Sequence, residues 1–448
     1  MKVQYIYSAT VLVEHKGVKL LCDPWFTEGI YHGSWFHYPP LKFVPEDFFD
    51  VDGIYLSHIH PDHVDTQALG HFPKNIPVYI HEYAEKYLLK LLKKLGFQQV
   101  QEVPHKREVQ LGPDFRMEIL SADNCDPVVC GRFFGCTFPG SLTLTVQLDS
   151  LAVFWGGGKT AVNVNDCPYP LAQSVCSYVK EKYGAVDFLM AGYSGAGEFP
   201  QCFDEEMNEP LLLENAERKR RQMLSQAVRY LEHLQPSFFM PFAGLYVLGG
   251  KFGRRNRFRG MPEMEELSAE FSTLLSRHQL SSQMVLLNSG EWFDLDQGSP
   301  SAPFTPPNPK ERARYVNDVL AGKQYDYEVE YRIADEKKVD LTARLLQAQR
   351  QMWQYQQLCG YKSDWKVYLD TAEEQLYCVP YDGRPVCKAD RGTEQQPFVR
   401  IQMDYSLLNM ILDRKAHWNN VVIGSHLTFA RKPEQFDRAV YQVLCYLY

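Results

Sequence analysis

The sequence predicts an α/β protein: a large layered domain followed by a smaller α+β module. In the first two thirds of the chain, short apolar runs of strand length alternate with longer segments of helical periodicity, the pattern of an α/β layered domain. Five prolines in the fourteen residues 297–310 interrupt that pattern and predict a linker. We therefore expect a domain over residues 1–296, a proline-rich linker over 297–310 and a small α+β domain over 311–448.

The expected elements of the large domain begin with a hairpin of residues 3–15 and 18–21 that turns at Lys16-Gly17. Residues 25–45 are aromatic and irregular, and we expect a loop that reaches over a site. Further strands are expected at residues 53–57, 115–121, 141–148, 151–155, 161–164, 186–191 and 238–242. Helices are expected at residues 82–95, 168–183 and 209–234.

The smaller module has its own set of expected elements. Helical periodicity indicates helices at residues 311–319 and 339–357. Strands are expected at residues 361–369, 375–380, 398–403 and 421–429.

The composition restricts the class of protein. Hydrophobic residues make up 45% of the 448 residues and charged residues 23%, as expected of a globular protein in water. The net charge of -8 makes nucleic acid an improbable partner. No apolar run is long enough for a transmembrane helix, so we expect no membrane partner, and the N-terminus lacks the layout of a signal peptide. Eleven cysteines at irregular spacing predict reduced thiols and a cytoplasmic location.

A short segment after a predicted strand, VDGIYLSHIHPDHVDTQ, concentrates groups that bind metals. His58, His60, Asp62 and His63 lie within six residues on a strand-to-helix turn, which Pro61 stiffens. Imidazole and carboxylate groups bind zinc or iron at about 2.0–2.2 Å, and a turn can direct alternate side chains toward two neighbouring ions. A buried histidine cluster without a cation would cost several kcal/mol of desolvation. The segment therefore predicts a metal site.

LSHIHPDHVD resembles the H-x-H-x-D-H signature of the metallo-β-lactamase fold superfamily, and DPWF at residues 23–26 is similar to a D-P segment of the same family. The resemblance implies an αββα sandwich with one or two metals at one edge of its sheets. It implies that His58 and His60 bind the first metal, and that Asp62 and His63 bind the second. Asp62 would also orient the reactive water, which gives it a catalytic role.

The second half of the family's ligand set is harder to place. Asp166, which follows the apolar run AVNVN, is the expected bridging carboxylate. The family's third histidine has no counterpart: EILSADNCDPVVC offers Asp126 or Asp123, with Cys125 as a weaker choice. The final histidine is also missing, since the matching segment is FFMPFAG. We expect one or two divalent ions of zinc, iron or manganese, and a carboxylate-rich ligand set favours iron or manganese.

A narrower resemblance concerns the CMP-N-acetylneuraminate hydroxylase family. NVNDCPYP, LMAGYSGAGEFPQCF, QPSFFMPFAGLYV and NNVVIGSHLTFARKP are similar to segments of that family. The resemblance implies hydroxylation of a nucleotide sugar with electrons from a Rieske domain. The C-x-H and C-x-x-H pairs of a Rieske centre are absent from this sequence. Either a separate electron-transfer partner supplies electrons or the reaction is not an oxygenation.

The expected partner is a small anionic substrate, such as a nucleotide sugar. The basic segment KFGRRNRFRG supplies Arg254, Arg255 and Arg257, whose guanidinium groups can bind phosphate oxygens in pairs. The glycine turn AGYSGAGEFP, represented by Gly195, can present backbone N–H groups to the same anion. The alternatives are a solvated basic loop and a tight structural turn.

Three functions fit these features. A metal-dependent hydrolase that acts on a phosphate-containing or nucleotide-sugar-like substrate through metal-activated water is the main expectation. The second is a non-haem iron hydroxylase of a nucleotide sugar that uses a separate electron donor. The third, favoured by the missing histidines, is a non-catalytic binding protein with a degenerate metal site.

Overall fold

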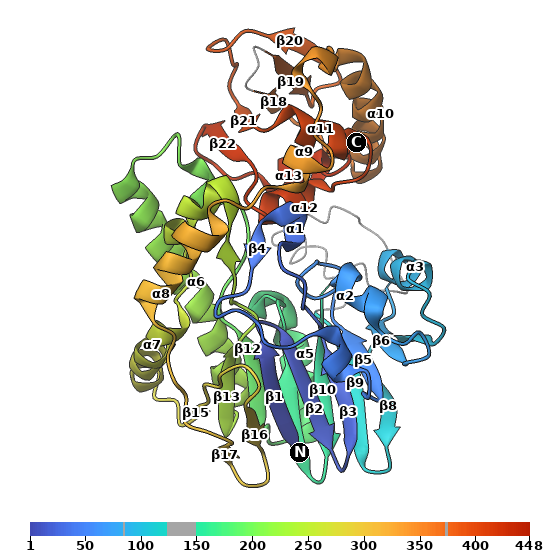
Figure 1. The fold of residues 1–448 in the computed structure, drawn as a ribbon, viewed down its shortest axis with the longest axis vertical. Coiled ribbons are helices and arrows are strands. Elements are labelled where there is room, and N and C mark those ends of the chain that lie inside the picture. Colours follow the sequence, from blue (N-terminus) through green and yellow to red (C-terminus); the bar gives the residue numbers. More distant parts are fainter. Residues whose placement is uncertain (84–85, 123–148, 372–374) are drawn as a thin grey trace.

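The computed structural model describes residues 1–448 except 84–85, 123–148 and 372–374. Two large sheets face one another with helices on their outer faces, and a separate five-stranded sheet with its own helices lies beyond one end of this sandwich (Figure 1). The predicted αββα sandwich with a smaller C-terminal α+β module is confirmed. In the part of the chain that is described, no helix combines the length and the apolar character needed to cross a bilayer.

The first large sheet has the strand order β17-β16-β1-β2-β3-β5-β6-β7. Strands β1 to β3 are antiparallel, whereas β3, β5, β6 and β7 are parallel to one another. The strands are β1 (Lys2–Tyr7), β2 (Thr10–His15), β3 (Val18–Cys22), β5 (Gly53–Leu56), β6 (Val78–His81), β7 (Val100–Val103), β16 (Trp292–Asp294) and β17 (Ser299–Pro300).

The second large sheet has the order β15-β13-β12-β11-β10-β9-β8. Strands β11, β12, β13 and β15 are parallel to one another, so their C-terminal ends point to the same edge of the sheet. The strands are β8 (Arg107–Gly112), β9 (Phe115–Ser121), β10 (Ser150–Gly156), β11 (Lys159–Asn163), β12 (Phe188–Gly192), β13 (Phe238–Phe242) and β15 (Gln283–Met284).

Successive side chains of a strand point to opposite faces of its sheet, so each sheet can pack against the other sheet on one face and against helices on the other. In β5, Tyr55 belongs to the core between the two sheets, whereas Ile54 and Leu56 belong to a core under the outer helices. Helices α2 (Thr66–His71) and α3 (Tyr87–Lys94) contribute to that outer core. The helices of the second sheet are α5 (Tyr169–Tyr183), α6 (Glu209–Leu234) and α7 (Met264–Arg277).

The C-terminal module is built on a sheet of order β20-β19-β18-β21-β22. Its strands are β18 (Lys366–Asp370), β19 (Leu376–Pro380), β20 (Cys387–Ala389), β21 (Phe398–Gln402) and β22 (Thr428–Lys432). Its helices are α9 (Asp326–Val329), α10 (Thr342–Cys359), α11 (Tyr405–Leu412), α12 (Trp418–Ile423) and α13 (Arg438–Leu444). The chain reaches the module through α8 (Pro309–Arg314) and a π-helical turn, Tyr315–Leu320.

The module lies against the edge of the sandwich where the parallel strands end. Helix α12 contacts α1 (Ile30–Gly33), which is followed by β4 (Trp35–Phe36), paired with β14 (Val247–Leu248) (Figure 1). The Ser34 hydroxyl donates a hydrogen bond of 2.5 Å to the backbone carbonyl of Gly424. The indole N–H of Trp35 donates to the backbone carbonyl of Ile423.

Three expected elements differ from the structure. The expected strand 3–15 is broken into β1 and β2 at Ser8, whose φ of 48° is incompatible with a strand. The expected strand 421–429 is instead α12 followed by β22, because the His417 side chain caps the helix and Ser425, with φ 58°, reverses the chain. Within the aromatic segment 25–45, Trp25 is fully buried and residues 30–38, which contain α1 and β4, are mostly buried, whereas residues 39–45 are half-buried or exposed. The expected strand 141–148 lies outside the described residues.

Arg255 joins the sandwich to the C-terminal module, which corrects its predicted role in substrate binding. The Arg255 side chain is fully buried. Its guanidinium donates to both carboxylate oxygens of Asp204, to the carbonyls of Ser425 and Leu427, and to the Thr428 hydroxyl. These acceptors engage its nitrogens, so the side chain is a structural clamp and is not free to bind a substrate.

We predict that Arg255→Met lowers the free energy of unfolding by about 3 kcal/mol or more, because it leaves buried acceptors without a donor. Arg257→Met is the matched control on the same segment, since Arg257 is exposed and forms a surface ion pair with Glu209, a contact worth less than about 1 kcal/mol. Chemical denaturation followed by fluorescence and circular dichroism measures both. Equal stability of the two variants would contradict the clamp.

Candidate metal centre

The histidine turn is fixed at both ends. Strand β5 delivers Ser57 and His58 to the sheet edge, and Asp65 caps α2 by accepting from the N–H groups of Gln67 and Ala68. The Asp65 carboxylate also accepts from the backbone N–H groups of Phe26 and Thr27, so the segment after β3 is tied to the same turn. The turn is therefore held by hydrogen bonds that do not depend on a ligand.

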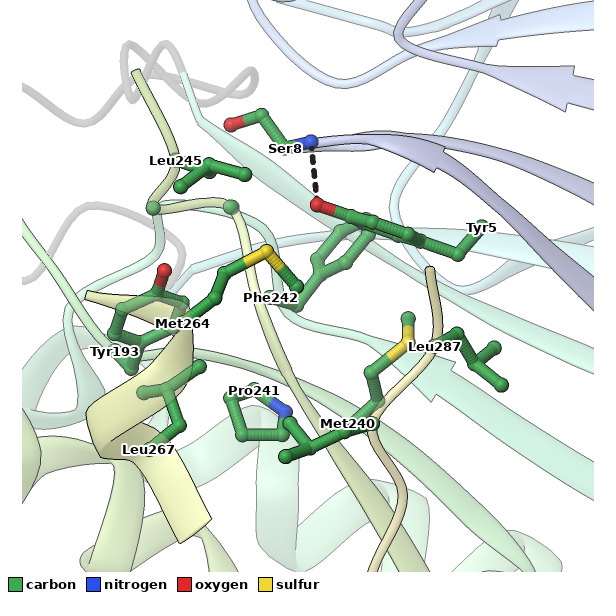
Figure 2. A pocket seen from close by; sticks show the side chains of 13 residues that line it. Tyr5, Ser8, Tyr193, Met240, Pro241, Phe242, Leu245, Met264, Leu267 and Leu287 are labelled. Atoms are coloured by element: carbon green, nitrogen blue, oxygen red, sulfur yellow. Dashed lines mark hydrogen bonds between the residues drawn. The ribbon is translucent and has the colours of Figure 1, made fainter. Parts of the chain in front are cut away.

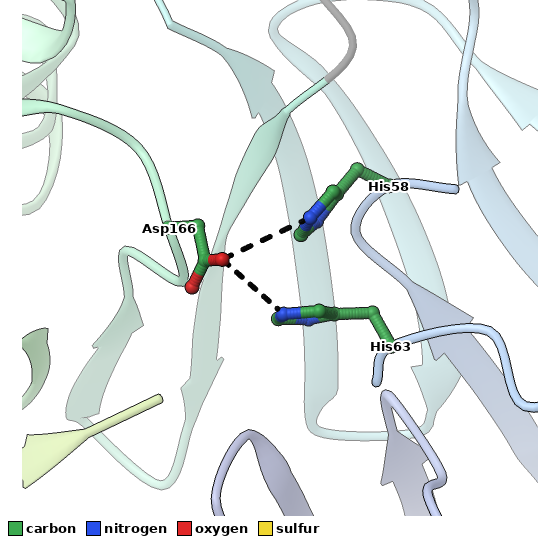
Figure 3. A group of neighbouring side chains, drawn as sticks. All are labelled: His58, His63 and Asp166. Atoms are coloured by element: carbon green, nitrogen blue, oxygen red, sulfur yellow. Dashed lines mark ion pairs between the residues drawn. The ribbon is translucent and has the colours of Figure 1, made fainter. Parts of the chain in front are cut away.

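Three side chains converge at this edge: His58, His63 and Asp166, whose ligand atoms all lie within 4.8 Å of one another (Figure 3). The Asp166 carboxylate oxygen is 3.9 Å from Nε2 of His58 and 3.5 Å from Nε2 of His63. The histidines come from the turn after β5, and Asp166 comes from the turn after β11, so the site bridges the two sheets.

Asp62 and His60 lie beside this group. One Asp62 oxygen is 3.4 Å from Nε2 of His63, and the other accepts a hydrogen bond of 2.5 Å from the Tyr31 hydroxyl. His60 directs Nδ1 toward Nε2 of His58 at 2.8 Å, while its Nε2 is 2.8 Å from the side-chain oxygen of Asn419 in the C-terminal module.

Asp23, which the sequence analysis noted only as part of the D-P segment, lies fully buried beneath the histidines. Its carboxylate accepts from the backbone N–H of Ser57 at 2.7 Å and from the Ser57 hydroxyl at 2.6 Å. It also accepts from Nδ1 of His63 at 2.8 Å. A carboxylate on Nδ1 leaves Nε2 of His63 directed at the site, the arrangement typical of a histidine that binds a metal.

Asp149 is a residue that the sequence analysis missed. It is buried immediately before β10, with a carboxylate oxygen 3.9 Å from Nε2 of His58. Burial, together with the negative charge of Asp166, raises the pKa of Asp149 to about 6, although the nearby histidines oppose this shift. The signal in the sequence was a carboxylate between the apolar runs 141–148 and 151–155, which lies after the segment EILSADNCDPVVC where a replacement for the third histidine was expected.

The pKa values of His58 and His63 are shifted in opposite directions. Burial lowers the pKa of His58 well below its usual value, with His63 and His60 adding to the effect. For His63, burial also disfavours the charged form, but the carboxylates of Asp62, Asp166 and Asp23 outweigh it and hold the pKa well above its usual value. The positive charge that is favoured on His63 is thus balanced by carboxylates on several sides.

The donor set fits a divalent cation. Among the described residues, Nε2 of His63 is buried and makes no hydrogen bond, and carboxylate oxygens of Asp62 and Asp166 lie 3.4 and 3.5 Å from it. The Ser57 hydroxyl donates to Asp23 and therefore accepts from Nδ1 of His58, which leaves a lone pair on Nε2 of His58. His60 donates from Nε2 to Asn419, which leaves a lone pair on its Nδ1. These two lone pairs face one another, and a divalent cation coordinated by both nitrogens would stabilise that arrangement.

The end of β13, where the family's final histidine is expected, presents no ligand. Phe242, Ala243 and Gly244 line a pocket with apolar neighbours such as Met240 and Leu267 (Figure 2). The other proposed replacements, Asp126, Asp123 and Cys125, lie outside the described residues. Within the described part of the chain, three histidines and three carboxylates lie at the centre: His58, His60, His63, Asp62, Asp149 and Asp166.

The predicted substrate-binding residues are not brought together with the metal ligands by any hydrogen bond or ion pair in the described structure. Arg254 is exposed and donates twice to Asp204, and Arg257 pairs with Glu209. Gly195 packs closely against the side chain of Met223. The segments that carry Gly195 and the arginines follow β12 and β13, which end at the metal edge, so their role in binding a substrate stays a prediction.

No family model matches this chain. Among curated proteins, a Mycobacterium tuberculosis protein named as a Rieske 2Fe-2S iron-sulfur protein is 26% identical over 249 residues, 54% of this chain and 44% of that protein. The cytidine monophosphate-N-acetylneuraminic acid hydroxylase of Danio rerio is 23% identical over 250 residues, 54% of this chain and 38% of that protein. The chain thus spans less than half the length of these two relatives.

Solved structures that this chain resembles are named as metal-dependent hydrolases, a diiron hydroxylase and a metallo-β-lactamase fold protein of Bacillus subtilis. An isothiocyanate hydrolase from Delia radicum gut bacteria is 14% identical with a TM-score of 0.43, over 66% of this chain and 99% of that chain. CmlA, a diiron beta-hydroxylase from Streptomyces venezuelae, is 20% identical with a TM-score of 0.38, over 64% of this chain and 53% of that chain.

We predict that the purified chain carries at least one divalent cation and that His58→Ala/His60→Ala loses it, because two nitrogen ligands are removed at once. Elemental analysis after gel filtration measures the metal content. His278→Ala is the control, because His278 lies on the surface and pairs with Glu232. Unchanged metal content in the double variant would contradict the assignment of these ligands.

We also predict that Asp23→Asn weakens metal binding by about 10- to 100-fold without removing any ligand, because the carboxylate that orients His63 is lost. Competition with a chromogenic chelator gives the dissociation constants. Asp187→Asn is a suitable control. The Asp187 carboxylate accepts hydrogen bonds from Lys159 and Thr160 at the starts of β11 and β12, the ends of these strands that are remote from the metal edge. Parent-like affinity of Asp23→Asn would show that Asp23 serves stability alone.

Proposed function

We propose that this protein is a metal-dependent hydrolase that uses metal-activated water at the centre formed by His58, His60, Asp62, His63, Asp149 and Asp166. The observation that carries the proposal is the convergence of His58, His63 and Asp166 from two sheets, with Nε2 of His63 buried and facing the carboxylates of Asp62 and Asp166. The ordered support beneath these residues favours a preformed centre over a degenerate one.

Bound divalent cations supply a Lewis acid and a nucleophilic hydroxide near neutral pH. The chain's own residues would do the rest. Asp23 holds His63 in the tautomer that directs Nε2 to the site, and Tyr31 holds one oxygen of Asp62. The second Asp62 oxygen remains free to orient water or to accept its proton. Asp149, whose carboxylate faces His58, is a further group that can bind the cation or orient water.

The proposed substrate is a small phosphate-containing anion of the nucleotide-sugar type. Support comes from the family resemblance of the sequence and from the location of Arg254 and Arg257 on the segment after β13, at the metal edge. Both guanidinium groups are exposed, so a phosphate could replace their carboxylate partners. The free buried thiols of Cys22, Cys167 and Cys176 support our expectation of a reducing compartment such as the cytoplasm.

A second candidate is a non-haem iron hydroxylase of a nucleotide sugar. The specific observation in its favour is the equal number of carboxylates and histidines at the centre, a ligand set that suits iron or manganese better than zinc. The hydroxylase names of a curated relative and of CmlA agree with this candidate. Because the sequence contains no Rieske ligand pairs, this reaction would need electrons from a separate partner.

The test is to reconstitute the metal-free chain separately with zinc, manganese and ferrous iron. A panel of phosphodiesters, esters and CMP- and UDP-sugars is then assayed for hydrolysis, with oxygen consumption followed in parallel under a chemical reductant. We expect hydrolysis that is lost in Asp166→Asn and retained in His278→Ala. Oxygen uptake coupled to product only with iron would replace the hydrolase by the hydroxylase. Metal binding without turnover of any substrate would favour the binding protein.

A further inference from the structure

We propose that the C-terminal module is a structural part of the metal centre: His426 holds Tyr31 against Asp62, and Asn419 holds His60. Tyr31, His426 and Asn419 are thereby positioning residues for metal binding. This inference rests on the proposed metal-dependent function and deepens it, because it assigns the module a role at the same site.

The first argument is the backbone of α1. Tyr31 and the following His32 both adopt left-handed conformations, with φ of 53° and 60°. Such conformations are unfavourable for residues with a Cβ and persist only where the surroundings determine them. Here the carbonyl of Tyr31 accepts a hydrogen bond of 2.7 Å from Nε2 of His426. The strained turn is therefore held from the C-terminal module.

His426 is itself fixed from several sides. Its Nδ1 is 3.1 Å from the Tyr327 hydroxyl, and its ring meets Tyr325 edge-on at 4.7 Å between centroids. Burial lowers the pKa of His426 to about 3, so the ring is neutral and donates from one nitrogen only. Arg255 binds the carbonyls on both sides of this residue, those of Ser425 and Leu427. The inter-module clamp thus sets the position of His426.

The consequence of this turn is the placement of the Tyr31 phenol. Its hydroxyl donates to one Asp62 oxygen at 2.5 Å, and its ring packs on Trp35 at 4.7 Å between centroids. A tyrosine hydroxyl ordinarily stays protonated at neutral pH, so it donates to this carboxylate. With one oxygen occupied, Asp62 directs the other toward His63 and the centre.

The second argument is the contact between Asn419 and His60. Asn419 lies at the start of α12, the helix that contacts α1 (Figure 1). Its side-chain oxygen accepts from Nε2 of His60, which keeps Nδ1 unprotonated and directed at the centre. Without that acceptor, the His60 ring is free to rotate or to take the other tautomer, and its ligand nitrogen is lost for part of the time.

The test compares the parent full-length chain, freed of metal by a chelator, with Tyr31→Phe, Asn419→Leu, His426→Phe and the pair Tyr31→Phe/His426→Phe. Zinc affinity is measured by chelator competition, and the visible spectrum of the cobalt(II) form reports the geometry of the ligands. Asn419→Asp, which keeps the acceptor oxygen, is the conservative variant, and Asn420→Leu is the control on the same helix. Thermal unfolding shows which variants fold.

We expect Tyr31→Phe and Asn419→Leu each to lose about 10- to 100-fold in zinc affinity with an altered cobalt spectrum. The zinc affinities of Asn419→Asp and Asn420→Leu should stay within about threefold of the parent's affinity, because neither change removes the acceptor of the His60 hydrogen bond. The pair should lose no more than its worse single variant, because both act through one contact. Full affinity in folded Tyr31→Phe and Asn419→Leu overturns this inference alone. A parent chain that binds neither zinc nor cobalt overturns the proposed function together with it.

Discussion

The buried carboxylate of Asp23 is the constraint on which the rest of the site depends. Burial raises its pKa, and an isolated charge at that depth would be costly, so its hydrogen bonds to Ser57 and His63 are what keep it in place. Those same bonds join the end of β3 to the turn after β5 and set the tautomer of His63. Stability and function are coupled there, because the groups that satisfy Asp23 also arrange the ligands.

The centre also depends on parts of the chain that lie far apart in sequence. The histidine turn belongs to the first sheet, Asp149 and Asp166 belong to the second, and Asn419 lies in the C-terminal module. In the proposed centre, the first sheet supplies three histidines and the carboxylate of Asp62, and the second sheet supplies the carboxylates of Asp149 and Asp166. The site is therefore formed only when the two sheets pack against each other, which links the αββα core directly to the chemistry.

The sequence predicted the features that depend on local pattern. Helix α6 and strand β13 have the predicted bounds, because their periodicity is uninterrupted and Asn208 caps the helix. The fold class and the histidine turn were also accessible, since both are encoded in short contiguous segments. The proline-rich segment is less simple than a free linker, because Ser299–Pro300 pairs with β16.

Residues whose role depends on tertiary contacts were not predictable. Asp149 looked like any acidic residue between strands, and its importance comes from burial beside His58. Tyr31 was one aromatic residue among many in its segment, and only the folded chain brings its hydroxyl to Asp62. Arg255 was grouped with its exposed neighbours because the sequence carries no signal that one arginine of the run is buried against Asp204. The pattern of charged residues in a sequence does not show which arginine side chain is exposed and which is buried in a structural ion pair.

The central claim is that one cation is held jointly by His63 of the first sheet and Asp166 of the second. Anomalous diffraction from crystals of the metal-loaded chain, recorded on both sides of the metal's absorption edge, tests it most directly. The account predicts an anomalous peak about 2.0–2.2 Å from both Nε2 of His63 and a carboxylate oxygen of Asp166. A peak bound elsewhere, or a fully loaded crystal with no peak between these two residues, would contradict it.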